Sequence, residues 1–190
     1  MTESPCSGSD AVLKAENAAI EMYRFAALML GSEKEALHLV ESTVAAVDVD
    51  PCADPGAVRG VVRDRVLDGA LAIMHRQDPG SFADVPAASA VSGCLDDDEL
   101  SPLSGEAISN LVEGTNRHRL RDWLGRLTQA QRAVFVQRAV LGQDNAATAR
   151  AINRFARPSI WTPDAVGLIF RQALCSLASS LVRAVPATHA

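Results

Sequence analysis

Apolar residues recur at helical spacing along almost the whole chain, and the alternation of apolar and polar residues that is typical of strands is nearly missing. The period is clearest in the second half, where Leu120, Trp123, Leu124 and Leu127 fall on one face of a helix. A chain of 190 residues with 48% apolar content can bury one sizeable core or two small ones. The pattern therefore predicts an all-α protein.

The first half of the chain divides into three predicted helices, over residues 11–30, 33–47 and 57–76. Gly31 is a natural C-terminal stop for the first helix, because glycine tolerates the left-handed conformation found there. Ser32 can cap the second helix, whose first turn is acidic. A cluster of Asp, Pro and Gly residues then separates the second helix from the third. Three helices with short breaks predict a small bundle.

Helical spacing resumes in the second half, with signals that mark where each helix begins and ends. The sequence TQAQ from Thr128 has the pattern of a capping box, and Gly142 ends the helix that follows. A short Ala-rich helix is expected over residues 145–152. A Thr-Pro pair then suits the cap and first turn of a last long helix, over about residues 163–185. These two helices, joined across a turn, predict a helix-turn-helix unit.

Charge is distributed unevenly along the chain. Lys and Arg number 7 against 12 Asp and Glu in residues 1–77, 0 against 8 in residues 78–116, and 11 against 3 in residues 117–190. We therefore expect a disordered N-terminus (1–10), a three-helix domain (11–77), an acidic linker (78–116) and a basic helix-turn-helix domain (117–190). Such asymmetry is typical of a segment that binds a polyanion, although basic and acidic parts can also simply neutralise each other.

Several classes of function find no support in the sequence. The four cysteines and four histidines are scattered without metal-ligand spacing, which predicts free thiols and no metal site. No Gly-rich phosphate loop and no convergent set of acid, base or nucleophile is present, so we expect neither an enzyme nor a cofactor nor a small-molecule substrate. The chain has no apolar run long enough for a membrane span and no signal peptide, which predicts a cytoplasmic protein with no membrane partner.

The order and spacing of these elements resemble those of the extracytoplasmic-function sigma factors, over about residues 11–185. LGSEKEALHLVESTV, from Leu30 to Val44, is similar to a segment of the N-terminal domain of that family. The C-terminal domain of the family is matched in step by Leu127, Gln131, Arg132, Val134, Arg138, Gly142, Ala149 and Ile152. The resemblance implies a sigma region 2-like bundle, a sigma region 4-like helix-turn-helix domain, and core RNA polymerase, promoter DNA and an anti-sigma factor as partners.

The resemblance also implies where a protein partner would bind. In the family, acidic residues of the second helix help to dock the protein on RNA polymerase. Here Glu35 and Glu41 keep that character, whereas Leu37 and His38 replace it. Leu37 and His38 could instead face a different protein, or Leu37 could widen the buried stripe of its helix.

The DNA contacts implied by the resemblance lie in the second half. The candidate DNA-binding residues are Arg132, Arg138, Arg150, Arg154, Arg157, Arg171 and Gln172. The arginines would mostly contact phosphates, while Arg171 and Gln172 are the best candidates for base edges.

Two departures from the family affect DNA recognition. Aspartates stand between the second and third helices, where the family carries aromatic and basic residues for promoter melting. Gly167, Leu168 and Ile169 occupy the base-recognition positions of the last helix, and the loop before it, residues 153–161, is longer than an ordinary turn. Either the loop contacts DNA through its arginines while Trp161 packs beneath the last helix, or DNA recognition is lost and that helix meets a protein.

These observations predict a sigma-factor-like transcription regulator that docks on RNA polymerase and contacts promoter DNA through its C-terminal domain. The alternative is a sigma mimic or co-regulator, which binds a sigma factor, an anti-sigma factor or polymerase through protein contacts alone.

Overall fold

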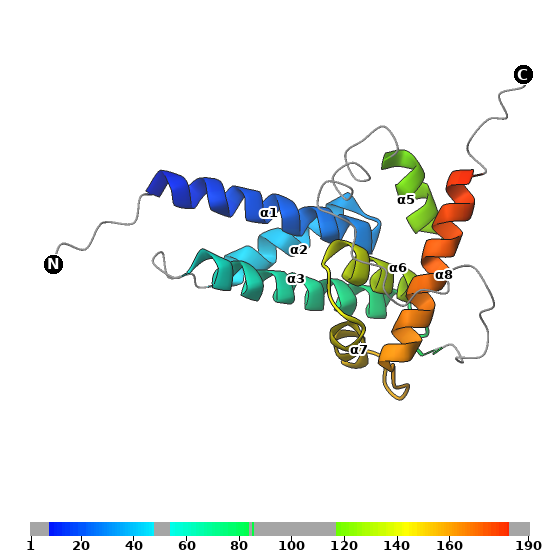
Figure 1. Cartoon of the computed structure of the whole chain (residues 1–190). Helices are drawn as coiled ribbons and strands as arrows, with labels where there is room; N and C mark the ends of the chain where they lie inside the picture. Colours follow the sequence, from blue (N-terminus) through cyan, green and yellow to red (C-terminus); the bar gives the residue numbers. More distant parts are fainter. Residues whose placement is uncertain (1–7, 48–53, 84, 86–116, 183–190) are drawn as a thin grey trace, which may run out of the picture. The chain divides into compact units, whose positions relative to one another are not determined.

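The computed structural model describes residues 8–47, 54–83, 85 and 117–182 (Figure 1). All secondary structure within these ranges is helical, which confirms the predicted fold class. The chain forms two compact units, residues 1–73 and residues 74–190. None of the described helices is long and apolar enough to span a membrane.

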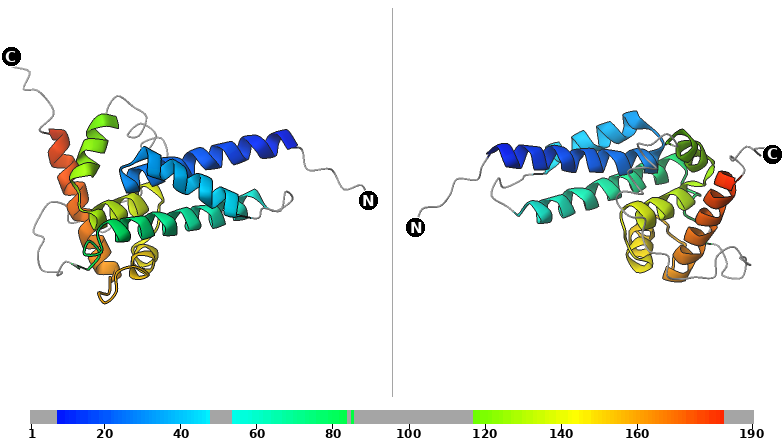
Figure 2. Two further views of the ribbon diagram at one scale, coloured as in Figure 1. Left: turned by 180° about the vertical axis from the view of Figure 1, so that it is seen from behind. Right: turned by 45° about the horizontal axis from the view of Figure 1, so that its top comes forward.

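The first unit contains α1 (Gly8–Leu30), α2 (Glu33–Ala46) and most of α3 (Pro55–Gln77). Both views of Figure 2 show these three helices alongside one another. As predicted, Gly31 ends α1 with a φ of 69°, and the Ser32 hydroxyl accepts a hydrogen bond from the backbone N–H of Glu35 (3.3 Å). α1 begins at Gly8, so residues 8–10 are helical and do not belong to a disordered end.

Asp54 explains why α3 begins two residues earlier than predicted. Its carboxylate accepts a hydrogen bond from the backbone N–H of Ala57 (2.8 Å), and Pro55 occupies the first turn, where its missing N–H costs nothing. One of the aspartates between the second and third predicted helices is therefore a helix cap. The neighbouring aspartates at 48 and 50 lie outside the described residues.

The three helices of the first unit pack against one another through small and apolar side chains. The buried set is Met22, Phe25, Ala26, Leu28, Met29, Leu30, Ala36, Leu39, Val40, Val66, Leu67, Ala70 and Leu71. Gly69 lets α3 approach α2 closely, because a Cβ atom there would lie 2.5 Å from a methyl carbon of Leu39. Arg59 forms an ion pair with Glu21 (3.7 Å), and Arg65 donates to the carbonyl of Ala46 at the C-terminal end of α2 (3.5 Å).

The second unit contains α5 (Arg117–Arg126), α6 (Gln129–Phe135), a π-helical segment η1 (Val136–Val140), α7 (Asn145–Asn153) and α8 (Pro163–Val182). The capping box is confirmed: Thr128 accepts from the N–H of Gln131 (3.2 Å), whose side chain accepts from the N–H of Thr128 (3.1 Å). Figure 1 shows α6 and α7 near the first half of α8 and α5 near its second half.

One element of the second unit differs from the expected single helix. After Phe135 the backbone widens into η1, where the N–H of Leu141 donates to the carbonyl of Val136, five residues back (3.0 Å). Gln137 in this segment is fully buried, and its side chain donates to the carbonyl of Ala133 (3.2 Å). Gly142 then ends the segment with a φ of 64°, as predicted.

Residues 78–83, which the sequence suggested as the start of the linker, pack within the second unit. The side chain of Phe82 is fully buried, and its carbonyl accepts a hydrogen bond from the Trp161 indole (2.9 Å). The Ser81 hydroxyl accepts from the N–H of Ala130 (3.1 Å), and the Ser159 hydroxyl donates to the carbonyl of Ala83 (2.6 Å). We call residues 81–83 the anchor segment. Most of the remaining linker lies outside the described residues.

The expectation of free thiols is wrong for one cysteine. Cys175, in α8, is disulfide-bonded.

Candidate nucleic-acid interface

The predicted helix-turn-helix unit corresponds to α7, a long loop and α8. Asp144 caps α7 by accepting from the N–H of Ala147 (2.6 Å), and Thr162 caps α8 by accepting from the N–H of Ala165 (3.2 Å). Each helix start therefore has one of its first N–H groups satisfied by a side chain of the chain itself.

Two hydrogen bonds close the loop between α7 and α8. The Asn153 side chain donates to the carbonyl of Trp161 (2.9 Å) and accepts from its N–H (2.7 Å). Trp161 itself is buried, as expected if it packs beneath the last helix. The loop is thus fixed at both ends, by the amide of Asn153 and by the indole of Trp161.

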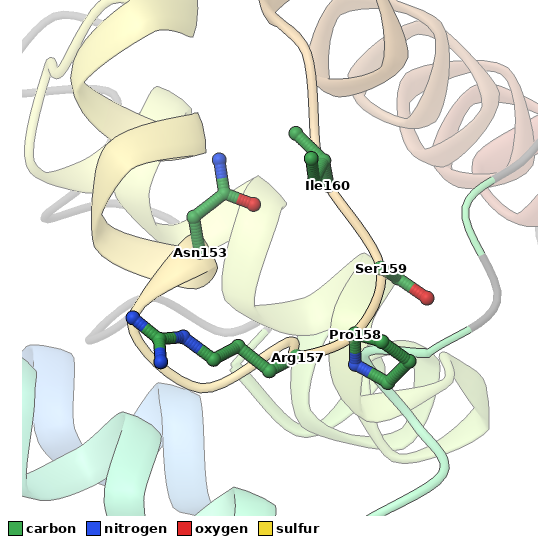
Figure 3. Close-up of a pocket in the computed structure, with 5 residues that line it drawn as sticks. All are labelled: Asn153, Arg157, Pro158, Ser159 and Ile160. Atoms are coloured by element: carbon green, nitrogen blue, oxygen red, sulfur yellow. The ribbon is translucent and has the colours of Figure 1, made fainter.

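Three of the candidate arginines are exposed around the end of α7. Arg150 and Arg154 are four residues apart, so they lie on the same face of the helix. Arg157 follows in the loop and lines an open hollow of about 690 Å³ together with Asn153, Pro158, Ser159 and Ile160 (Figure 3). The structure therefore places Arg150, Arg154 and Arg157 close together in the chain and in contact with solvent.

Arg132 and Arg138 are not exposed in the same way. Both side chains are half-buried, and burial lowers the pKa of the Arg132 guanidinium below its usual value because the charged form is desolvated. Arg138 donates to the carbonyl of Gln143, and its guanidinium lies 5.1 Å from the centre of the Phe170 ring. Arg138 therefore joins η1 to α8, and we assign it a structural role.

The base-recognition positions of α8 are mostly buried. Leu168 and Ile169 are 4% and 6% exposed, and Gly167 faces the Asn145 amide, which a Cβ atom would approach to 3.1 Å. Arg171 and Gln172, one turn later, are half-buried. Leu168 and Ile169 are apolar because they pack in the core, and Gly167 is small because α7 approaches α8 closely at that position.

The start of α8 offers no guanidinium, ammonium or amide donor for base edges. Its exposed residues are Thr162, Pro163 and Asp164, of which only the last is charged. The carboxylate of Asp164 suits the positive N-terminal end of α8, but it would repel the phosphates on either side of a major groove.

The candidate partner residues of the first unit lie along α2. Glu35 is half-buried, whereas Leu37, His38 and Glu41 are exposed. Leu37 is 50% exposed, so it does not widen the buried stripe of α2. Val44 is 47% exposed and lies on the same face as Leu37 and Glu41.

Sequence reasoning missed the anchor segment and the exposed apolar residue Ile160. Phe82 stands in a stretch rich in Pro, Gly, Ser and Ala without a helical period, and its partner Trp161 is 79 residues away. One signal was available: a lone aromatic residue in such a stretch, in a chain with only 4% aromatic residues.

Comparison of the chain with protein-family models, with curated proteins and with solved structures finds no match. Among the described residues, no group of three His, Cys, Asp or Glu side chains is placed to hold a metal ion.

Proposed function

We propose that this protein is a sigma-factor-like transcription regulator whose second unit binds duplex DNA by its phosphates. The observation that carries the proposal is the group of exposed arginines Arg150, Arg154 and Arg157 at the end of α7 and in the following loop. Guanidinium groups are well suited to phosphate oxygens, and such contacts supply most of the sequence-independent affinity for DNA.

The proposed binding mode differs from ordinary helix-turn-helix recognition. Leu168 and Ile169 are committed to the core, and the start of α8 presents the carboxylate of Asp164. We therefore propose that sequence preference is weak. In the cell, the choice of promoter would then depend on core RNA polymerase, which we propose the first unit contacts through the exposed face of α2.

A second candidate function is favoured by that same face. Leu37 and Val44 together expose apolar surface beside the carboxylate of Glu41, and apolar side chains with a charged rim are common in protein interfaces. A co-regulator that binds a sigma factor, an anti-sigma factor or polymerase without contacting DNA would use this face alone.

A titration of the full chain with a fluorescent DNA duplex at several salt concentrations tests the DNA contact. We compare the double variant Arg150→Ala/Arg154→Ala with Arg119→Ala/Arg126→Ala, which removes the same charge from exposed positions on α5. The α7 variant should reduce the slope of log K against log salt by about 1.8, at about 0.9 for each phosphate contact. Equal slopes for the two variants, or no binding by the wild type, would overturn the proposal.

Binding to core RNA polymerase tests the α2 face. Leu37→Ser should weaken polymerase binding, whereas Val61→Ser, at an equally exposed position on α3, should not. Retained polymerase binding that depends on Leu37, together with no DNA binding, would favour the second candidate function.

A further inference from the structure

The loop between α7 and α8 presents an apolar side chain to solvent. Ile160 is 74% exposed, the largest exposed fraction among the large apolar residues that the structure describes. Figure 1 shows that the loop projects beyond the neighbouring ends of α7 and α8. In Figure 3, Ile160 and Arg157 lie on the side of the loop that faces α7, whereas Ser159 points the other way.

Ile160 is held in this exposed position by its neighbours on both sides. Ser159 is bonded to the carbonyl of Ala83, and Trp161 is bonded to Asn153 and to the carbonyl of Phe82. The side chain of Ile160 therefore cannot reach the core without breaking these contacts. A single exposed apolar residue is ordinary, but here it stands on an anchored, projecting loop beside a solvent-exposed guanidinium.

A minor groove of duplex DNA fits this combination. Its negative potential attracts arginine side chains, and proteins that bind there place Ile, Leu, Phe, Met or Pro against the base steps. The loop supplies Arg157, Pro158 and Ile160 within four consecutive residues. The hollow of about 690 Å³ between Arg157 and Ile160 leaves room for a sugar–phosphate wall of the groove. Arg150, on α7, and Arg154, directly after it, suit the flanking phosphates.

We propose that this loop enters the minor groove of duplex DNA, with Arg157 and Ile160 as the contacting residues. The inference rests on the proposed function and names the groove that the second unit recognises. The described residues from Arg150 to Pro163 carry three exposed arginines and no carboxylate, and this local positive charge favours a polyanion over an apolar protein surface.

Competition and substitution in the full chain test the proposal. The probe is a duplex with a central A-tract, whose narrow minor groove favours arginine. A distamycin-type minor-groove ligand should displace the protein, whereas a ligand that occupies the major groove of the same duplex should leave affinity unchanged. Ile160→Ala should weaken binding by about fivefold, because an apolar contact is lost. Arg157→Lys should weaken binding even though it keeps the charge. The control Val61→Ala, at an exposed apolar position on α3, should bind as the wild type does.

The outcomes separate this inference from the proposed function. In one outcome the wild type binds DNA and Arg150→Ala/Arg154→Ala weakens that binding, but Ile160→Ala binds as Val61→Ala does and the minor-groove ligand does not compete. That outcome overturns only the groove assignment. Unchanged DNA affinity together with weaker polymerase binding by Ile160→Ala would overturn it in favour of a protein contact. Failure of the wild type to bind DNA would overturn both.

Discussion

At the scale of single residues, Asn153 has the most precisely defined role in the loop that carries Arg157. Its amide both donates to and accepts from the backbone of Trp161. Asn153→Asp should destabilise the second unit by about 1–3 kcal/mol at neutral pH, because the donor is lost and two oxygens then face each other. The cost should shrink near pH 4, where a protonated carboxyl can donate again.

Intrinsic fluorescence measures this effect during denaturation. Both tryptophans of the chain, Trp123 and Trp161, belong to the second unit, so the signal reports on that unit alone. A cost that is the same at pH 4 and pH 7 would contradict the assigned hydrogen bonds.

Two glycines of the second unit form a matched pair that separates backbone strain from packing. A Cβ atom at Gly142 or at Gly125 would meet nothing within 4 Å, but only Gly142 has a positive φ, 64°. Gly142→Ala should therefore cost about 1 kcal/mol in unfolding free energy, while Gly125→Ala, within α5, should gain up to about 0.5 kcal/mol. Denaturation followed by fluorescence checks both values, and effects of the same sign would contradict the argument.

At the scale of elements, the sequence predicted helices where their ends carry local signals. Gly31, Ser32, Thr128 and Gly142 each act through bonds or dihedral angles within a few residues, so their roles follow from the sequence alone. Two features could not be predicted in this way. The π-helical segment depends on how Gln137 and its neighbours pack, and the anchor segment depends on a contact between Phe82 and a tryptophan far along the chain.

The candidate site could be predicted only in part, for a related reason. Counting arginines identified the basic segment, residues 117–190, but charge alone does not distinguish Arg150 from Arg138. Arg138 lies against Phe170 and bonds the backbone of the turn after η1, whereas Arg150 is exposed. Solvent exposure, which decides whether a guanidinium can meet a phosphate, arises from tertiary packing.

The anchor segment gives an element-scale prediction. Phe82 is fully buried, so Phe82→Ala should destabilise the second unit by about 3–5 kcal/mol through lost contacts and an unfilled cavity. Ala83→Ser, at an exposed position in the same segment, should change stability by less than about 0.5 kcal/mol. Fluorescence-detected denaturation measures both variants. A small effect of Phe82→Ala would mean that residues 81–83 do not pack in the second unit.

At the scale of the whole molecule, a net charge of −5 conceals a basic segment, residues 117–190. The net charge is −5 for residues 1–77, −8 for residues 78–116 and +8 for residues 117–190. Affinity for a polyanion depends on the local potential at the contact, so the overall sign does not exclude DNA binding. If the proposed contacts are right, DNA should interact with one unit and leave the other unaffected.

This division predicts which part of the molecule DNA stabilises. A ligand that binds only the folded second unit, at 100 times its dissociation constant, should raise the unfolding free energy of that unit by about 2.7 kcal/mol. Tryptophan fluorescence during denaturation measures this gain in the second unit. Amide hydrogen exchange of buried residues such as Phe25 and Leu71 reports on the first unit, and DNA should not change their protection from exchange. With Arg150→Ala/Arg154→Ala at the same DNA concentration, the gain should be smaller. Equal protection of both units would instead mean that DNA binds to the first unit as well, and that the exposed arginines of α7 are only part of the interface.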